Sequence, residues 1–226
     1  DEIQTGFGRT GKLFACQHEN VEPDILCLAK SLGGGVMPIG ATVTTAKIWD
    51  QAYGTMDKAL LHTSTFGGNT RAVAAGIAAL NAIIETELPR QAADKGQYLL
   101  GKIRELGEKH GLITDIRGQG LLIGIEFSKP TGLVDKLTKG AMSKFSEEYL
   151  GAMVAGELLN HHRIITAYTL NNPNVIRLEP PLIVTKEELD QLVQALDEVF
   201  TRNRSHIRMA LASTKTVVGS LFGRKQ

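Results

Sequence analysis

The stretch Ile25-Leu26-Cys27-Leu28-Ala29-Lys30-Ser31-Leu32-Gly33-Gly34-Gly35 joins a continuous apolar run to a lysine and a triple glycine. An apolar run of this length is typical of a strand covered on both faces, as in α/β proteins. Lys30 follows the run directly, and a charged ammonium at the end of a buried strand is costly unless something uses it. The glycines would let the backbone approach a ligand closely. The stretch therefore predicts an α/β fold with a ligand site around Lys30, and an ordinary surface lysine is the alternative.

The segments on either side of this stretch extend the α/β pattern. Residues 39–45 are rich in β-branched side chains and predict a second strand. A helix is expected over about 71–87, where apolar residues recur at helical spacing: Val73, Ile77, Leu80 and Ile84. A second helical stretch covers about 90–110, and Gly111 is well placed to stop it.

The second half of the chain predicts a smaller α+β domain. The expected elements are strands at 113–116, 121–127, 164–169 and 175–178, a helix at 144–161, and a final helix from Thr185. Thr185 and Glu188 have the spacing of a capping box. The buried stripe of the final helix is expected to be Leu189, Leu192, Val193, Leu196 and Phe200. We therefore divide the chain into the rear part of a large α/β domain (1–88), a linking helix (89–110), a small domain (111–203) and a basic tail (204–226).

The overall composition is that of an ordinary soluble protein. Of the 226 residues, 42% are hydrophobic and 22% are charged, and the net charge of +1 gives no sign of a nucleic-acid or membrane partner. Cys16 and Cys27 form no disulfide framework and fit a reducing, cytoplasmic setting. The basic tail has two interpretations, a frayed terminus or a surface helix that contacts an anionic partner. The sequence opens on Asp1-Glu2 without an initiator methionine, so we expect a piece of a longer protein.

Several motifs follow one another in a fixed order. They are Asp1-Glu2-Ile3-Gln4-Thr5-Gly6, Gly8-Arg9-Thr10-Gly11, Pro23-Asp24-Ile25, Leu28-Ala29-Lys30, Gly33-Gly34-Gly35, His62-Thr63-Ser64-Thr65-Phe66-Gly67-Gly68-Asn69, Arg117-Gly118-Gln119-Gly120-Leu121 and Ile176-Arg177-Leu178-Glu179-Pro180-Pro181-Leu182. This series resembles the class III aminotransferases over about residues 1 to 200. The resemblance implies a fold type I transferase that depends on pyridoxal phosphate.

The resemblance also implies a role for individual residues. Lys30 would hold the cofactor covalently and then carry a proton between substrate and cofactor carbons. Asp1 would keep the pyridine nitrogen protonated, and Gln4 would bond the phenolic oxygen of the ring. Thr65 would bind the cofactor phosphate across a subunit interface, which implies a homodimer. Arg177 would clamp a carboxylate of the acceptor 2-oxoglutarate. No metal is implied.

The amine donor is less well defined by the sequence. The segments 13–21, 23–28, 35–42 and 169–172 most resemble the branch of the family that acts on putrescine, which implies a role in polyamine degradation. Ornithine, acetylornithine and 4-aminobutanoate remain alternative donors. A donor without a carboxylate at its reacting end must coexist with Arg177, and relatives achieve this with an acidic residue that the sequence does not identify.

Two features of the family are missing from this sequence. Its phosphate-binding glycine turn and its ring-stacking aromatic residue normally precede Asp1. This chain by itself is therefore expected to be inactive or to bind the cofactor weakly. A non-catalytic protein that keeps the fold for assembly is the competing interpretation.

Overall fold

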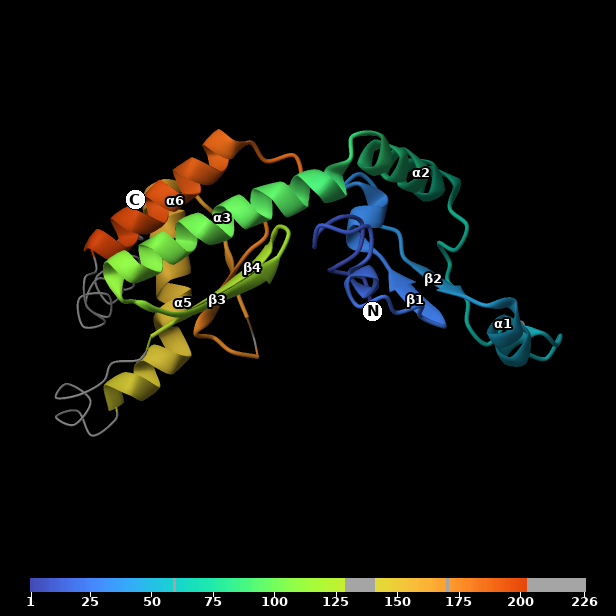
Figure 1. Cartoon of the computed structure of the whole chain (residues 1–226). Coiled ribbons are helices and arrows are strands. Elements are labelled where there is room, and N and C mark those ends of the chain that lie inside the picture. The colour runs from blue at the N-terminus through green and yellow to red at the C-terminus, as the bar shows by residue number, and fades with distance from the viewer. Residues whose placement is uncertain (59, 129–140, 170, 203–226) are drawn as a thin grey trace, which may run out of the picture. The chain divides into compact units, whose positions relative to one another are not determined.

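The structure, a computed structural model, describes residues 1–58, 60–128, 141–169 and 171–202. It divides into two compact units, Asp1–Asp94 and a second unit that begins at Lys95. The boundary falls inside the long helix α3 (Leu88–His110), drawn in green in Figure 1. Each unit contains its own β-sheet.

The first unit is built on two antiparallel strands, β1 (Ile25–Leu28) and β2 (Ala41–Thr44). Its helices are the short 3-10 turns η1 (Ala15–His18) and η2 (Lys30–Gly33), with α1 (Ala46–Tyr53) and α2 (Thr70–Glu85). Phe7, Leu28 and Ile83 form the buried core, so it joins the first loop, β1 and α2. The loop before β1 and the turn after it are thus held against the same helix.

The first unit combines helices with strands, as the predicted α/β fold requires. The strand pair among its described residues is antiparallel, whereas the large domain as a whole was expected to be mainly parallel. The strand at 25–28 was expected to be covered on both faces, but Ile25 is 51% exposed. The expected helix is present as α2, and the apolar residues Val73, Ile77 and Ile84 that indicated it are exposed.

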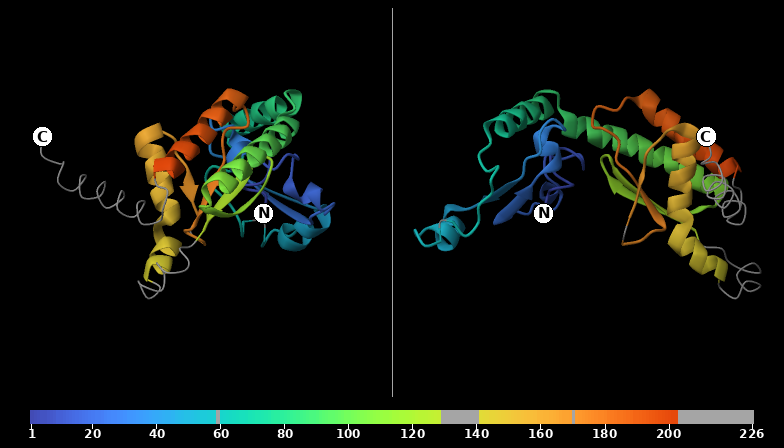
Figure 2. Two further views of the ribbon diagram at one scale, coloured as in Figure 1. Left: turned by 60° about the vertical axis from the view of Figure 1, so that its left-hand side comes forward. Right: turned by 180° about the vertical axis from the view of Figure 1, so that it is seen from behind.

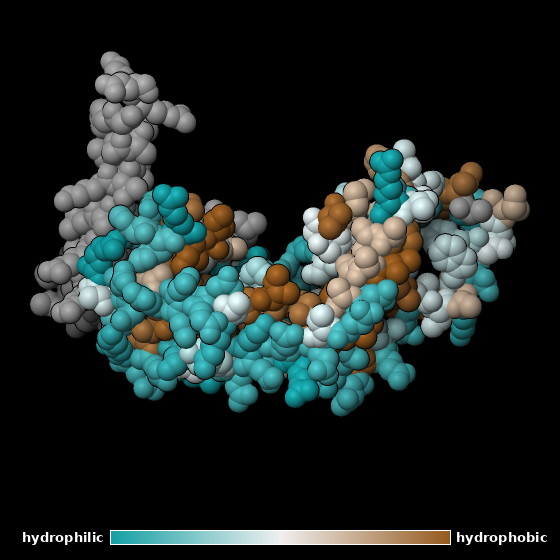
Figure 3. All heavy atoms as spheres, turned by 90° about the horizontal axis from the view of Figure 1, so that it is seen from above, coloured by the Kyte–Doolittle hydropathy of each residue, from teal (hydrophilic) through white to brown (hydrophobic). Residues whose placement is uncertain are grey.

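The face that α2 buries is instead made of Ala72, Gly76 and Ile83. Small residues are needed there because η2 packs closely on the helix: a Cβ added to Gly76 would stand 3.3 Å from the carbonyl oxygen of Leu32. Apolar side chains consequently come to the surface of this unit, as the brown atoms over it in Figure 3 show.

The second unit has a four-stranded antiparallel sheet in the order β3-β4-β6-β5. Its strands are β3 (Ile113–Gln119), β4 (Leu122–Phe127), β5 (Ala167–Tyr168) and β6 (Val175–Leu178), and its helices besides α3 are α5 (Ala141–His162) and α6 (Lys186–Arg202). The views in Figure 2 show α5 and α6 beside the sheet. Alternate residues of β4 are buried, so one sheet face meets the core and the other stays partly open.

Helix α6 closes the core of the second unit. The predicted capping box is confirmed, since Glu188 N donates to Thr185 Oγ1 (3.2 Å) and Thr185 N donates to the Glu188 carboxylate (2.8 Å). The buried side chains of α6 include Ala195 and Val199, which the predicted stripe omitted, while Val193 is only half-buried. The ring of Phe200 packs edge-on against Phe127 in β4, with centroids 6.1 Å apart.

The remaining expectations concern the strand at 164–169, the two cysteines, membrane-spanning helices and the basic tail. The predicted strand at 164–169 is shorter in the structure, because Ile164 N still bonds the end of α5 at Leu158 O (3.1 Å). Cys16 and Cys27 are both free thiols. No single helix among the described residues is long and apolar enough to cross a membrane, and only the bent pair α2 and α3 passes by length and composition. The basic tail at 204–226 lies outside the described residues.

Candidate active site

The loop that precedes β1 is organised by the carboxylate of Glu2, which is 4% exposed. One of its oxygens accepts a hydrogen bond from Cys16 N (2.8 Å), and the other accepts one from Thr5 Oγ1. The backbone N–H of Glu2 donates to Cys27 O in β1 (3.0 Å). Glu2 therefore folds the loop on itself and fixes the loop to the strand that leads to Lys30.

The hydrogen bonds around Glu2 also set its charge state. Burial alone would raise the pKa of the Glu2 carboxyl, but the hydrogen bonds from Thr5, Ala15 and Cys16 outweigh it, and the pKa lies below its ordinary value. The same carboxylate raises the pKa of the Cys16 thiol, together with partial desolvation of the sulfur, which is the larger cause. Glu2 is thus held as an anion, and Cys16 is held as a thiol.

Lys30 stands where β1 ends and η2 begins. Its backbone has a φ of 50°, in the left-handed region that side-chain-bearing residues seldom adopt. Its side chain is exposed, and Nζ donates to the amide oxygen of Gln4. Asp1, at the start of the same loop, accepts a hydrogen bond from Ile3 N (2.8 Å). The structure therefore brings Lys30 to Gln4, and Glu2 ties the chain next to Asp1 to β1.

The turn after Lys30 is fixed by close backbone packing. Gly34 has a φ of 62° and ends η2, and a Cβ at this position would lie 3.0 Å from the Cβ of Ala79 in α2. Leu32 meets Gly76 of the same helix in the contact described above. The triple glycine thus allows the Lys30 turn to lie directly on α2.

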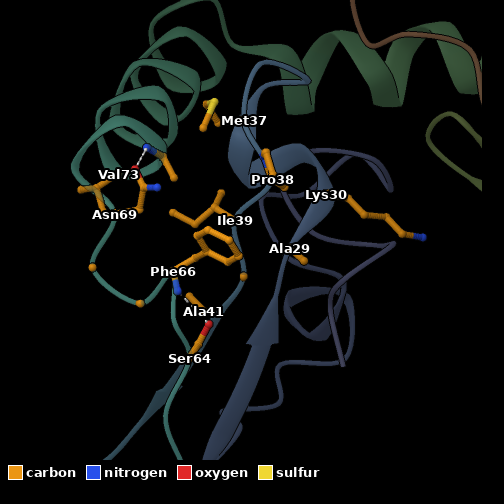
Figure 4. Close-up of a pocket in the computed structure, with 14 residues that line it drawn as sticks. Ala29, Lys30, Met37, Pro38, Ile39, Ala41, Ser64, Phe66, Asn69 and Val73 are labelled. Atoms are coloured by element: carbon orange, nitrogen blue, oxygen red, sulfur yellow. Dashed lines mark hydrogen bonds between the residues drawn. The ribbon is translucent and has the colours of Figure 1, made fainter.

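A cavity of about 910 Å³ lies beside this turn, between the segments 37–41 and 64–73. Figure 4 shows Ile39, Phe66 and Asn69 around it, whereas the Lys30 side chain points away from them. Thr65 is exposed and stands between two residues that line this cavity, Ser64 and Phe66.

Arg177 lies in the second unit, on β6, and lines a separate cavity of about 330 Å³. Its side chain is 39% exposed, and its Nη1 stands 3.4 Å from the Glu179 carboxylate. The Nε of Arg177 is buried and has no hydrogen-bond partner among the residues that the structure describes. The cavity also contains Thr166 and the apolar side chains of Ile164, Ile165 and Leu192.

Two acidic residues of these sites were not identified from the sequence. Glu2 was treated only as part of a motif, and its burial carried no sequence signal beyond its place next to Asp1. Glu179 was quoted only within the Arg177 motif, and it follows the last residue of β6 directly. Among the described residues, no group of His, Cys, Asp or Glu could hold a metal ion.

Comparison with known proteins places this geometry in a family. The class-III aminotransferase family profile matches residues 1–200. The chain belongs to the class-III aminotransferases. The acetylornithine aminotransferase from Elizabethkingia anophelis is a similar solved structure, with 34% identity over 88% of this chain and 46% of that chain, and a TM-score of 0.68.

Two further aminotransferase structures are similar at the same level. The ornithine aminotransferase from Plasmodium yoelii is 31% identical over 89% of this chain and 47% of that chain, with a TM-score of 0.72. An amine transaminase from an uncultivated Pseudomonas species, solved in its pyridoxal-phosphate-bound form, is 31% identical over 89% of this chain and 43% of that chain, with a TM-score of 0.73. The chain thus spans less than half the length of these aminotransferases.

Class-III aminotransferases depend on pyridoxal phosphate, and the residues around Lys30 fit that cofactor. A covalent site for an aldehyde needs a reachable primary amine, and Lys30 Nζ is exposed at the end of a fixed turn. A polarised aromatic ring needs a carboxylate and a hydrogen-bond donor, which Asp1 and Gln4 supply from one loop. The contact between Lys30 and Gln4 shows that this loop and the lysine meet within the chain.

Proposed function

We propose that the full-length gene product is a pyridoxal-phosphate-dependent aminotransferase that moves an amino group from a diamine such as putrescine to 2-oxoglutarate. The observation that carries the proposal is the contact of Lys30 Nζ with Gln4, at the end of β1, in a chain of this family. The contact between Lys30 and Gln4 favours an active site over the alternative of a non-catalytic protein that keeps the fold only for assembly.

The proposed roles follow from the chemistry of each side chain. Bound pyridoxal phosphate supplies an electron sink for the carbon that loses its proton. The Lys30 amine would bind the cofactor, and once released would move the proton at that carbon. The Asp1 carboxylate would hold a proton on the ring nitrogen, which a neutral side chain would not hold at neutral pH. Gln4 would orient the ring oxygen and Lys30 itself.

The amine donor has two candidates, each with its own support. The segments 13–21, 23–28, 35–42 and 169–172 support a putrescine-like diamine. Ornithine and acetylornithine are supported by the similar solved structures, which include enzymes named for those substrates. In either case Arg177, in a partly apolar cavity, would bind a carboxylate of 2-oxoglutarate by a bidentate contact.

We also propose a cytoplasmic homodimer. Thr65 would reach the cofactor phosphate of the partner subunit. The exposed position of Thr65, beside Phe66, which is itself 77% exposed, supports an interface at this segment.

The test is a donor panel on the full-length gene product and its Lys30→Ala variant. We expect amino transfer from putrescine to 2-oxoglutarate, and a loss of rate of about 10²- to 10⁴-fold in the variant with an unchanged circular dichroism spectrum. Lys47→Ala, an exposed lysine of α1, is the matched control. A preference for ornithine or acetylornithine would select the second donor class. Substantial turnover by Lys30→Ala would contradict the proposal.

A further inference from the structure

Two neighbouring residues of the long helix α3, Lys95 and Gly96, contact two loops of the second unit's sheet. Gly96 lies against the turn between β3 and β4, where a Cβ added to it would overlap the carbonyl oxygen of Gly120. Backbone can approach the helix this closely only because Gly96 has no side chain. The Nζ atom of the half-buried Lys95 donates to the carbonyl oxygen of Leu182, 3.2 Å away, in the segment between β6 and α6.

Both loops lie at the end of the sheet that carries Arg177. The strands β4 and β6 are antiparallel, and Ile123 pairs with Leu178. The turn that precedes β4 and the segment that follows β6 are therefore at the same end of the sheet. Arg177 is the last residue but one of β6, so it stands at this end too. Helix α3 consequently fixes the sheet end at which the cavity beside Arg177 lies.

The segment that follows β6 forms one wall of this cavity, through Pro180 and Pro181. Neither proline has a backbone N–H, so neither position can supply a backbone donor that holds the wall in place. A turn is closed by Val184 N, which donates to Pro181 O (2.9 Å). The Lys95 ammonium holds the next carbonyl, that of Leu182. The Lys95 contact therefore joins the wall to a helix that is distant in sequence.

We infer that Lys95 is a positioning residue for the carboxylate acceptor, because it holds the wall of the cavity in which Arg177 would bind that carboxylate. The inference rests on the proposed function. A bidentate contact requires both carboxylate oxygens in place, so a wall that shifts weakens it. Lys95 is not among the described residues that line the cavity, and it acts through Leu182 and the two prolines next to it.

The test compares three variants of the full-length gene product carrying pyridoxal phosphate. Lys95→Met keeps the aliphatic stem and removes the donor, whereas Lys95→Arg keeps a charged donor. Lys102→Met is the matched control, because Lys102 bonds Glu105 within the same helix (3.0 Å). Binding of the unreactive dicarboxylate glutarate is measured by calorimetry, and kcat and KM are measured for donor and acceptor.

The expected effect is selective for the acceptor. Lys95→Met should bind glutarate about fivefold more weakly, the factor that one net hydrogen bond is worth, and should raise the KM for 2-oxoglutarate by a similar factor. The KM for the amine donor should not change. Lys95→Arg should restore most of the affinity, and Lys102→Met should leave it unchanged. Hydrogen exchange at the Val184 N–H should be faster in Lys95→Met, because the turn that it closes has lost its anchor.

Three results would overturn the inference. A lower melting temperature of Lys95→Met with unchanged glutarate affinity would show that Lys95 serves only the fold. An affinity loss that disappears at about 1 M salt, where charges more than about 3 Å apart are screened, would assign the effect to the charge of Lys95 and not to the wall. Equal increases in KM for donor and acceptor would also contradict it. Failure of the wild-type protein both to bind glutarate and to transaminate any donor would instead refute the proposed function itself, and the inference with it.

Discussion

At the scale of single residues, Glu2 is the side chain on which the loop before β1 depends. Its buried carboxylate accepts from Thr5 and Cys16, and its backbone bonds β1. Removing a buried acceptor leaves its donors unsatisfied, at a cost of about 1–3 kcal/mol for each. Glu2→Gln should therefore lower the melting temperature of the full-length gene product at pH 7. Glu22→Gln, an exposed residue of the same loop, should not.

The difference in melting temperature between wild type and Glu2→Gln should depend on pH. Because the pKa of Glu2 is lowered in the folded protein, its contribution to stability is present above the ordinary glutamate pKa and is lost as the pH falls through the lowered value. The difference in melting temperature between wild type and Glu2→Gln should shrink as the pH is lowered below about 4.3. A difference that stays constant from pH 7 to pH 3 would show that the charge of Glu2 is not what holds the loop.

At the scale of elements, the end of α3 is fastened to α6 by one carboxylate. Asp197 bonds Lys109 (2.8 Å) and His110 (2.5 Å), and the His110 ring packs on Phe200. The hydrogen bond from Lys109, followed by that from His110, lowers the pKa of Asp197. This network stabilises the last turn of α3. The helix dipole also stabilises the positively charged side chains at this end of the helix.

Asp197→Asn should therefore loosen the second unit. The group is partly exposed, so we expect a loss of about 1 kcal/mol, or about 4–8 °C in melting temperature for a unit of this size. The loss should be largest above the ordinary aspartate pKa and vanish as the pH falls through the lowered value. Glu108→Gln, exposed on the same helix, is the control, and an equal shift in the control would argue against the network.

Elements were predictable from sequence where their signals are local. The start of α6 follows from the Thr185–Glu188 capping box, and the end of α3 follows from Gly111, whose φ is 64°. The helix α2 was predicted from its periodicity, but its buried face was not, because the close approach of η2 requires the small residue Gly76 there. Packing between segments distant in sequence leaves no such local pattern.

The residues of the candidate sites were likewise predictable from sequence only where their signal is local. Lys30 is conspicuous in sequence because it ends an apolar run before glycines, and its contact with Gln4 is present in the structure. Glu2 and Glu179 required coordinates, because burial and side-chain pairing decide what they do. The roles of Asp1, Thr65 and Arg177 stay predictions.

At the scale of the whole molecule, the chain belongs to the class-III aminotransferases and spans less than half the length of its solved relatives. Exposed apolar side chains of the first unit, such as Leu60, Phe66 and Ile77, are consistent with further packing partners in the proposed homodimer. Lys30 and Arg177 lie in different units, Lys30 in contact with Gln4 and Arg177 beside the cavity at β6. The proposed function divides its chemistry between them.

The central claim is that Lys30 holds the cofactor. The most direct measurement is borohydride reduction of the full-length gene product after incubation with pyridoxal phosphate, followed by peptide mass mapping. Reduction converts a carbon–nitrogen double bond to lysine into a stable bond, so it reports which lysine was linked. The account predicts a label concentrated on Lys30 and lost in Lys30→Ala. A label spread over several lysines, or no label at all, would contradict it.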